Sequence, residues 1–239
     1  MEWIEGKAKR DIIFIHGAGL NANEWKDVMS ILSGEKKAYA LNLPGHPKGK
    51  IVCKTVEEYA DQIIGFIQQN ESRFVLCGHS MGGAIALRVA IKRPDLVSAL
   101  ILVSTSAKFY VDRRIVEGFE ENTLRTIEHV ITPLSFYTID ENIIKKARDA
   151  LSLENSEVFL NDYLACSSFD ETNNLKYVQP KTLIICGEQD RMTKPYLSQY
   201  LHQNIPDSEL YLIRNAGHML PIEKPNILAN LISSFLEKI

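Results

Sequence analysis

Short apolar runs alternate with helix-like segments along most of this chain. Six runs end in glycine or polar residues, as buried strands of a parallel sheet do: DIIFIHG (11–17), KAYALNLPG (37–45), RFVLCG (73–78), SALILVS (98–104), KTLIICG (181–187) and ELYLIRN (209–215). A capping box at Thr55 and Glu58 begins one of the intervening helices. The alternation predicts an α/β fold with a mostly parallel open sheet, flanking helices and right-handed crossovers.

Residues 107–178 interrupt the alternation. They contain no strand-like run, and their segments have helical character, with Pro133 as a break between helices. We predict an all-helical insertion at residues 107–178 that packs on a core formed by residues 1–106 and 179–239. The chain contains no internal repeat or flexible linker that would let the insertion move as an independent module.

Composition and charge restrict the partners. The 239 residues are 45% hydrophobic, and the net charge of -3 comes without a long basic block of the kind that binds phosphates. No segment approaches the ~18 apolar residues of a membrane helix. We therefore expect a soluble, cytoplasmic protein without nucleic-acid partners or stable membrane insertion; its oligomeric state is left open. The four cysteines are too scattered for a zinc pattern, so we expect no metal and reduced thiols in the core.

One motif carries chemistry. Gly78-His79-Ser80-Met81-Gly82 fits G-x-S-x-G and lies between a predicted strand and a predicted helix, where a nucleophile elbow requires it. In such a turn the serine backbone is strained and its hydroxyl projects above the carboxyl end of the sheet. A serine hydroxyl is a weak nucleophile, so it needs an imidazole to take its proton and a carboxylate to orient the imidazole.

Topology selects the partners of Ser80. Functional groups of open α/β sheets gather at the carboxyl ends of strands, and Asp190 and His218 each follow a predicted strand. Three rival acids do not: Asp162 and Asp170 in the insertion, and Asp207 before the last strand. Two other histidines lie in predicted helices, where a structural role is the default: His129 and His202. The other three do not combine strand end with chain order: His16 ends the first strand, His46 lies in a loop rich in glycine and proline, and His79 is the variable position beside Ser80.

The order of motifs resembles the α/β-hydrolase family, in particular its esterase-like and lipase-like members with a helical cap. The shared motifs span nearly the whole chain: HGAG (16–19), Trp25, LPGH (43–46), GHSMGG (78–83), GEQD (187–190) and GHMLPIEKP (217–225). The resemblance implies that Ser80 is the nucleophile, Asp190 the orienting acid and His218 the base. It also implies an oxyanion hole made by the backbone N–H groups of Ala18 and Met81.

The resemblance further implies a structural role for His16. The chain departs from the family pattern at two places. Only about ten residues precede the run DIIFIHG, which is too few for the two further strands usual in the family, so we expect a shortened antiparallel edge. Asn42 stands where the family has an acid, in a loop that often borders the pocket.

Three functions are compatible with these residues. The first is a serine carboxylesterase that cleaves esters with short to medium acyl chains through an acyl-enzyme, without a cofactor. The second uses the same triad for lactone opening, carbon–carbon bond hydrolysis or a lyase step, and the third is a non-catalytic ligand-binding protein. We expect the insertion to cover Ser80 and line an apolar pocket; the residues predicted to contact substrate are Gly19, Phe136, Tyr137 and Tyr163.

Overall fold

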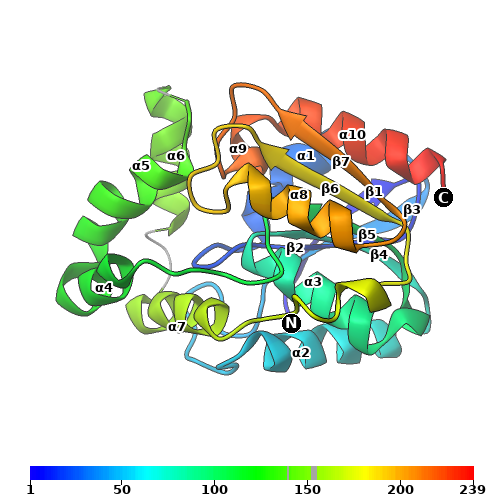
Figure 1. The fold of residues 1–239 in the computed structure, drawn as a ribbon, viewed down its shortest axis with the longest axis horizontal. Helices are drawn as coiled ribbons and strands as arrows, with labels where there is room; N and C mark the ends of the chain where they lie inside the picture. The colour runs from blue at the N-terminus through cyan, green and yellow to red at the C-terminus, as the bar shows by residue number, and fades with distance from the viewer. Residues whose placement is uncertain (139, 152–154) are drawn as a thin grey trace.

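A seven-stranded sheet forms the centre of the computed structural model, which describes residues 1–138, 140–151 and 155–239 (Figure 1). Its strands, in the spatial order β1-β3-β2-β4-β5-β6-β7, are β1 (Trp3–Ala8), β3 (Lys36–Leu41), β2 (Ile12–Ile15), β4 (Phe74–His79), β5 (Val97–Val103), β6 (Thr182–Gly187) and β7 (Ser208–Ile213). β1 pairs antiparallel with β3, and all other neighbours are parallel. The predicted mostly parallel α/β sheet is confirmed, with a single antiparallel strand at its edge.

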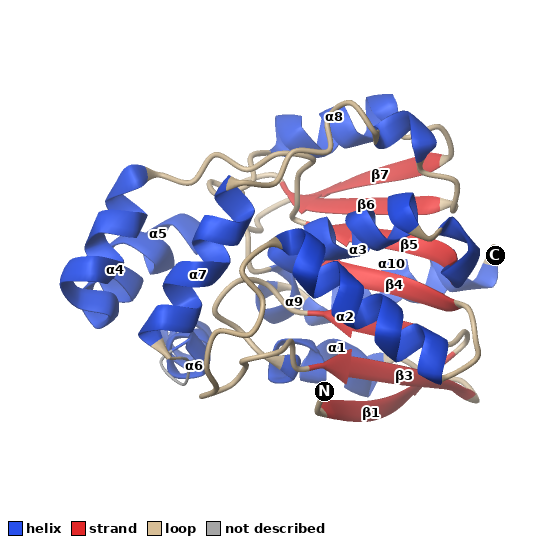
Figure 2. Cartoon of the chain, turned by 90° about the horizontal axis from the view of Figure 1, so that it is seen from below, coloured by secondary structure: helices blue, strands red, loops and turns tan. Residues whose placement is uncertain are grey.

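Helices cover both faces of the sheet (Figure 2). One face packs against α2 (Val56–Gln69), α3 (Met81–Lys92) and α8 (Pro195–Asn204). The other face packs against η1 (Ala22–Trp25), α1 (Lys26–Ile31), α9 (Leu220–Glu223) and α10 (Pro225–Glu237). Every residue of β4 and β6 is therefore buried, which explains why these strands read as continuous apolar runs.

Local signals in the sequence set several helix ends. Thr55 caps α2, because its side chain accepts a hydrogen bond from the N–H of Glu58. The return bond of the predicted capping box is shifted by one residue, since the Glu58 carboxylate accepts from Lys54 N rather than from Thr55 N. Helix α3 ends at Lys92, and Pro94 begins the short helix η2 (Pro94–Leu96).

The chain between β5 and β6 forms the helical insertion. Its elements are α4 (Arg113–Thr126), the π-helical turn η3 (Ile127–Ile131), α5 (Thr132–Ser135), α6 (Glu141–Leu151), α7 (Ser156–Ser167) and η4 (Leu175–Tyr177). Figures 1 and 2 show α4 to α7 beside the sheet, and their apolar side chains form a separate cluster that also includes Leu20 and Met219 of the core. The insertion, here called the cap, therefore lies against loops at the carboxyl ends of the strands.

Within the described ranges, the structure contains no helix of the length and apolarity that crossing a membrane requires. All four cysteines are buried and free.

Candidate active site

Ser80 occupies a sharp turn between β4 and α3. Its backbone φ is 50°, in the left-handed region that non-glycine residues seldom adopt. The glycines around it are required by close backbone contacts: a Cβ on Gly78 would lie 2.1 Å from the carbonyl oxygen of Gly82, and a Cβ on Gly82 would lie 2.2 Å from that of Ile15. The G-x-S-x-G pattern thus reflects a turn too tight for side chains at both glycines, and it leaves Ser80 facing a cavity.

Asp190 and His218 meet at the ends of β6 and β7. Oδ2 of Asp190 lies 2.9 Å from Nδ1 of His218, and both side chains are almost fully buried. The other oxygen of Asp190 accepts hydrogen bonds from the N–H groups of Met192 and Thr193, at 2.9 and 2.8 Å. Burial would raise the pKa of the Asp190 carboxyl, but His218 and the hydrogen bonds from Thr193 outweigh burial and lower that pKa. Asp190 is therefore held as a carboxylate beside the imidazole.

Thr193 is a site residue that the sequence analysis missed. Its Oγ1 donates to Oδ2 of Asp190 at 2.8 Å and lies 3.1 Å from Nδ1 of His218. The sequence offered one signal for Thr193, which is its position three residues after Asp190 and just before the proline that starts α8. An aspartate carboxylate often binds hydroxyl and N–H groups two or three residues further along the chain. The hydroxyl restricts how the carboxylate and the imidazole face each other.

The loop of His218 is also held by the cap. The N–H of His218 donates to the carbonyl oxygen of Ser135, at the end of α5, at 2.8 Å. Glu223 accepts hydrogen bonds from Gly217 N with one oxygen and from Tyr137 N and Thr138 N with the other, each at 3.0 Å. These bonds attach the cap chain after α5 to the loop that carries the imidazole.

Residues 17–19, here called the β2 loop, lie beside the turn of Ser80. Gly17 N donates to Oε2 of Glu24 at 3.0 Å, and Gly19 N donates to Oδ2 of Asp162 at 2.9 Å. The N–H of Ala18, between them, forms no hydrogen bond to any residue described in the structure. The N–H of Met81 is the first of α3, and such groups have no partner within their helix. Among the described residues the Ala18 N–H thus has no partner, and the Met81 N–H follows Ser80 directly at the start of α3.

His16 holds the β2 loop without facing the cavity. Its Nδ1 lies 2.8 Å from the carbonyl oxygen of Gly17, and its Nε2 accepts from Leu43 N at 3.1 Å. Burial, followed by the charge of His46, lowers the pKa of His16 well below its usual value. A neutral ring with one donor and one acceptor fits both contacts.

The three rival acids lie elsewhere. Asp162 is fully buried, but its carboxylate binds Gly19 N, Nε2 of His46 and the hydroxyl of Tyr59. Asp170 pairs with Lys108 at the surface, and Asp207 is exposed before β7. Of these four acids, Asp190 contacts His218.

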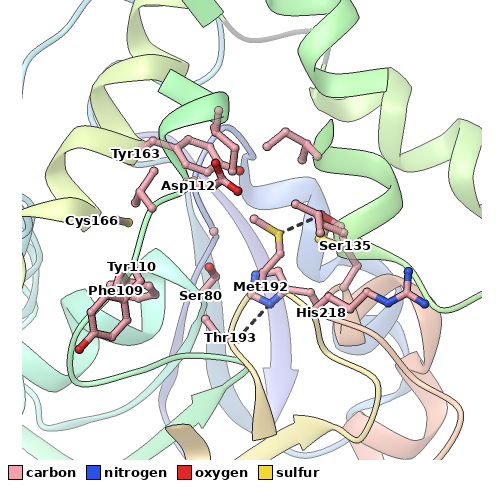
Figure 3. Close-up of a pocket in the computed structure, with 18 of the residues that line it drawn as sticks. Ser80, Phe109, Tyr110, Asp112, Ser135, Tyr163, Cys166, Met192, Thr193 and His218 are labelled. Carbon is pink, nitrogen blue, oxygen red and sulfur yellow. Dashed lines mark hydrogen bonds between the residues drawn. The ribbon is translucent and has the colours of Figure 1, made fainter. Parts of the chain in front are cut away.

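Ser80 and His218 line one cavity of about 300 Å³ (Figure 3). In that view Ser80 lies between Phe109 and Tyr110 on one side and Met192 on the other. Within the described part of the chain no hydrogen bond joins Ser80 Oγ to His218, which is common for a nucleophile and base before substrate binds. The cap supplies much of the apolar wall: Val111, Ile115, Ile131, Leu134, Leu151, Tyr163 and Cys166.

The cavity wall differs in part from the expected one. Tyr163 lines it, but Gly19, Phe136 and Tyr137 are not among its lining residues. Gly19 lies under the ring of Phe159, which a Cβ would meet at 2.2 Å. Phe136 is buried in the apolar cluster of the cap, and the side chain of Tyr137 is exposed. Phe136 and Tyr137 follow α5 in an extended segment, and the sequence does not show which way the side chains of such a segment point.

The chain belongs to the family with the alpha/beta hydrolase fold, whose model matches residues 12–225. An uncharacterized hydrolase, YugF, of Bacillus subtilis is 26% identical in an alignment 258 positions long, which covers 99% of this chain and 93% of that protein. A pimeloyl-(acyl-carrier protein) methyl ester esterase of Proteus mirabilis is 27% identical, with 92% of this chain and 90% of that protein covered. The crystal structure of a lipase-esterase related protein from Clostridium acetobutylicum superposes with a TM-score of 0.84 at 25% identity, covering 98% of each chain.

Proposed function

We propose that this protein is a serine hydrolase that cleaves carboxylic esters through Ser80, His218 and Asp190. The observation that carries the proposal is the Asp190–His218 contact of 2.9 Å beside the cavity that Ser80 faces from a strained turn. The likeness to a protein named a methyl ester esterase supports the same reaction class.

In the proposed reaction Ser80 Oγ attacks the ester carbonyl and passes its proton to Nε2 of His218. Nδ1 of the ring faces Asp190, whose carboxylate stabilises the imidazolium that forms. The N–H groups of Ala18 and Met81 donate to the negative oxygen of the tetrahedral intermediate. His218 then protonates the leaving alcohol, and the ring next activates a water molecule that hydrolyses the acyl-enzyme.

Replacing the nucleophile tests this proposal. Ser80→Ala should lower kcat for p-nitrophenyl esters by on the order of 10⁴ to 10⁶, and Ser80→Ala with His218→Ala should lose little more, because the residues act as a unit. A fluorophosphonate should label Ser80, as mass spectrometry of the peptides would show.

Ser104→Ala is the matched control. Ser104 is a buried serine with a φ of 45° at the end of the neighbouring strand β5, and it does not line the cavity. This variant should keep full activity. Substantial esterase activity in Ser80→Ala would refute the assignment.

The cavity supports short to medium acyl chains as substrates. Its volume of about 300 Å³ is at the small end of ligand pockets, and each buried methylene contributes up to ~0.8 kcal/mol, or roughly fourfold in kcat/KM. Across p-nitrophenyl esters from acetate to palmitate, kcat/KM should therefore rise with acyl-chain length and then fall. Tyr163→Ala and Ile115→Ala should move the optimum to longer chains, whereas Tyr177→Ala, an exposed residue outside the cavity, should not. A profile that neither cavity variant changes would place the acyl site elsewhere.

A further inference from the structure

A second buried carboxylate–imidazole pair lies beside the proposed triad, and the reaction described above does not use it. Nδ1 of His79 lies 2.5 Å from Oε1 of Glu24, and the side chains are 1% and 0% exposed. His79 directly precedes Ser80 at the end of β4, and Glu24 comes from η1. The rings of His79 and His218 have centroids 4.8 Å apart. The Glu24–His79 pair is therefore buried, and it lies next to Ser80 and His218.

The pair connects the three segments that the reaction needs. Nε2 of His79 donates to the carbonyl oxygen of His218 at 3.0 Å, so the ring holds the loop of the base. The other oxygen of Glu24, Oε2, accepts a hydrogen bond from Gly17 N at 3.0 Å and so holds the β2 loop. The ring also packs tightly against that loop, since a Cβ on Gly17 would lie 2.9 Å from Nδ1. A change in this pair would shift Ala18, Ser80 and His218 relative to one another.

The surroundings of His79 favour a charged ring. Nε2 of His79 donates to a carbonyl oxygen, and Nδ1 lies 2.5 Å from the carboxylate of Glu24. A ring that carries both protons forms an ion pair with this carboxylate and keeps the bond from Nε2. The groups that face it are Glu24, Asp190, His218 and His16. Burial lowers the pKa of His79, but Glu24, the carbonyl of His218 and Asp190 outweigh burial and raise it. The ring of His79 lines the cavity, whereas Glu24 does not.

We propose that Glu24 and His79 are positioning residues, which hold the β2 loop and the loop of His218 in register with Ser80. This inference rests on the proposed serine hydrolase function. Neither residue exchanges a proton with substrate. Their effect is on geometry: the pair fixes where the N–H of Ala18 lies with respect to the oxygen that becomes negative in the transition state.

Glu24→Gln tests the proposal with the least structural change, because the amide still accepts from Gly17 N and still contacts His79 but carries no charge. We expect kcat to fall by about 10- to 100-fold, less than the loss of an oxyanion donor, with KM changed by less than about threefold because the change acts on the transition state. The double variant Glu24→Gln, His79→Gln has no unpaired buried charge. It should lose about as much as Glu24→Gln alone, since the two residues act together.

The pH dependence and the NMR spectrum provide readouts that a purely structural role would not move. The pKa of His79 is raised, so its charge is kept below that pKa and lost as the pH rises through it. Wild-type kcat should therefore decline toward that of Glu24→Gln at alkaline pH. The ¹⁵N shifts of His79, assigned with His79→Gln, should show two protonated nitrogens at pH 7 in the wild type and one in Glu24→Gln.

Glu171→Gln is the matched control. Glu171 is a buried glutamate that pairs with Arg88 and Asn174 and is not among the residues that line the cavity. It should lose stability but keep kcat within about twofold. Any one of three results would overturn the proposal. These are a loss of kcat in the control equal to that of Glu24→Gln, an unchanged kcat in both Glu24 variants, and a singly protonated His79 in the wild type. If Glu24→Gln does not fold, the double variant and the wild-type NMR spectrum decide. Activity retained by Ser80→Ala would instead refute the hydrolase function itself.

Discussion

The β2 loop is held on its two sides by carboxylates from different regions of the molecule. Glu24 belongs to the core, and it binds Gly17 N from only 7 residues further along the chain. Asp162 belongs to cap helix α7, and it binds Gly19 N across a separation of 143 residues. Each carboxylate also pairs with a buried histidine, His79 for Glu24 and His46 for Asp162. Ala18, whose N–H we assign to the oxyanion hole, lies between the two anchored glycines.

The histidines make the two anchors different. His79 also donates a hydrogen bond to the carbonyl oxygen of His218 and so links the β2 loop to the proposed base. Asp162, through its other oxygen, instead accepts from the hydroxyl of Tyr59 on α2, so its contacts attach the cap to the core. We therefore expect loss of the core anchor to appear mainly in the reaction rate, and loss of the cap anchor mainly in stability.

The largest loss of activity is expected at Asp190, the carboxylate that contacts the proposed base, rather than at either anchor. Asp190→Asn keeps the shape of the side chain but removes the charge beside His218, so kcat should fall by roughly 10³ to 10⁴. Steady-state kinetics of Asp190→Asn, Asp162→Asn and Glu24→Gln in parallel would measure this. An equal loss in Asp162→Asn would mean that the cap supplies the acid, and the comparison of the anchors would fail.

A smaller effect, on stability, should identify the cap anchor. Asp162→Asn weakens buried hydrogen bonds to Gly19, His46 and Tyr59, and we expect a loss of about 3 kcal/mol in the free energy of unfolding. For a domain of this size this corresponds to a fall in Tm of roughly 6–12 °C, measured by thermal denaturation. The kcat of the folded variant should change by less than about tenfold. Unchanged stability would show that the cap is held by its apolar contacts alone.

The smallest effect on stability is expected at Asp170, a cap carboxylate that is exposed. Asp170 pairs with Lys108 at 2.7 Å, but both side chains are about 40% exposed, so Asp170→Asn should cost between 0 and about 1 kcal/mol. The hydrogen bond with Lys108 is the main cause that lowers the pKa of Asp170 to about 2. Its contribution is present above the ordinary carboxyl pKa and is lost as the pH falls toward 2. Urea denaturation at pH 7 and pH 3 would measure it; a loss as large as that of Asp162→Asn would mean that exposure does not separate the two.

Much of the proposed site was predictable because its signals are local. Gly78 and Gly82 reveal the tight turn of Ser80, and the strand runs before Asp190 and His218 place both residues at the same edge of the sheet. Thr193 had a weaker local signal, three residues after Asp190. Glu24 and His79 had none, because nothing near either residue indicates that their side chains meet in the interior.

The sequence by itself determined the succession of the six parallel strands along the chain, the position of the insertion and the residue types at the strand ends. These follow from periodicity and from glycine or proline at fixed positions, which act over a few residues. The tertiary structure alone decided which buried carboxylate pairs with which histidine, and which cap side chains reach the cavity. Those contacts join segments as far apart as Gly19 and Asp162. The contacts within the core depend on how its loops pack together, and those of the cap depend on how the cap helices are rotated against the core; the packing of the whole chain sets both.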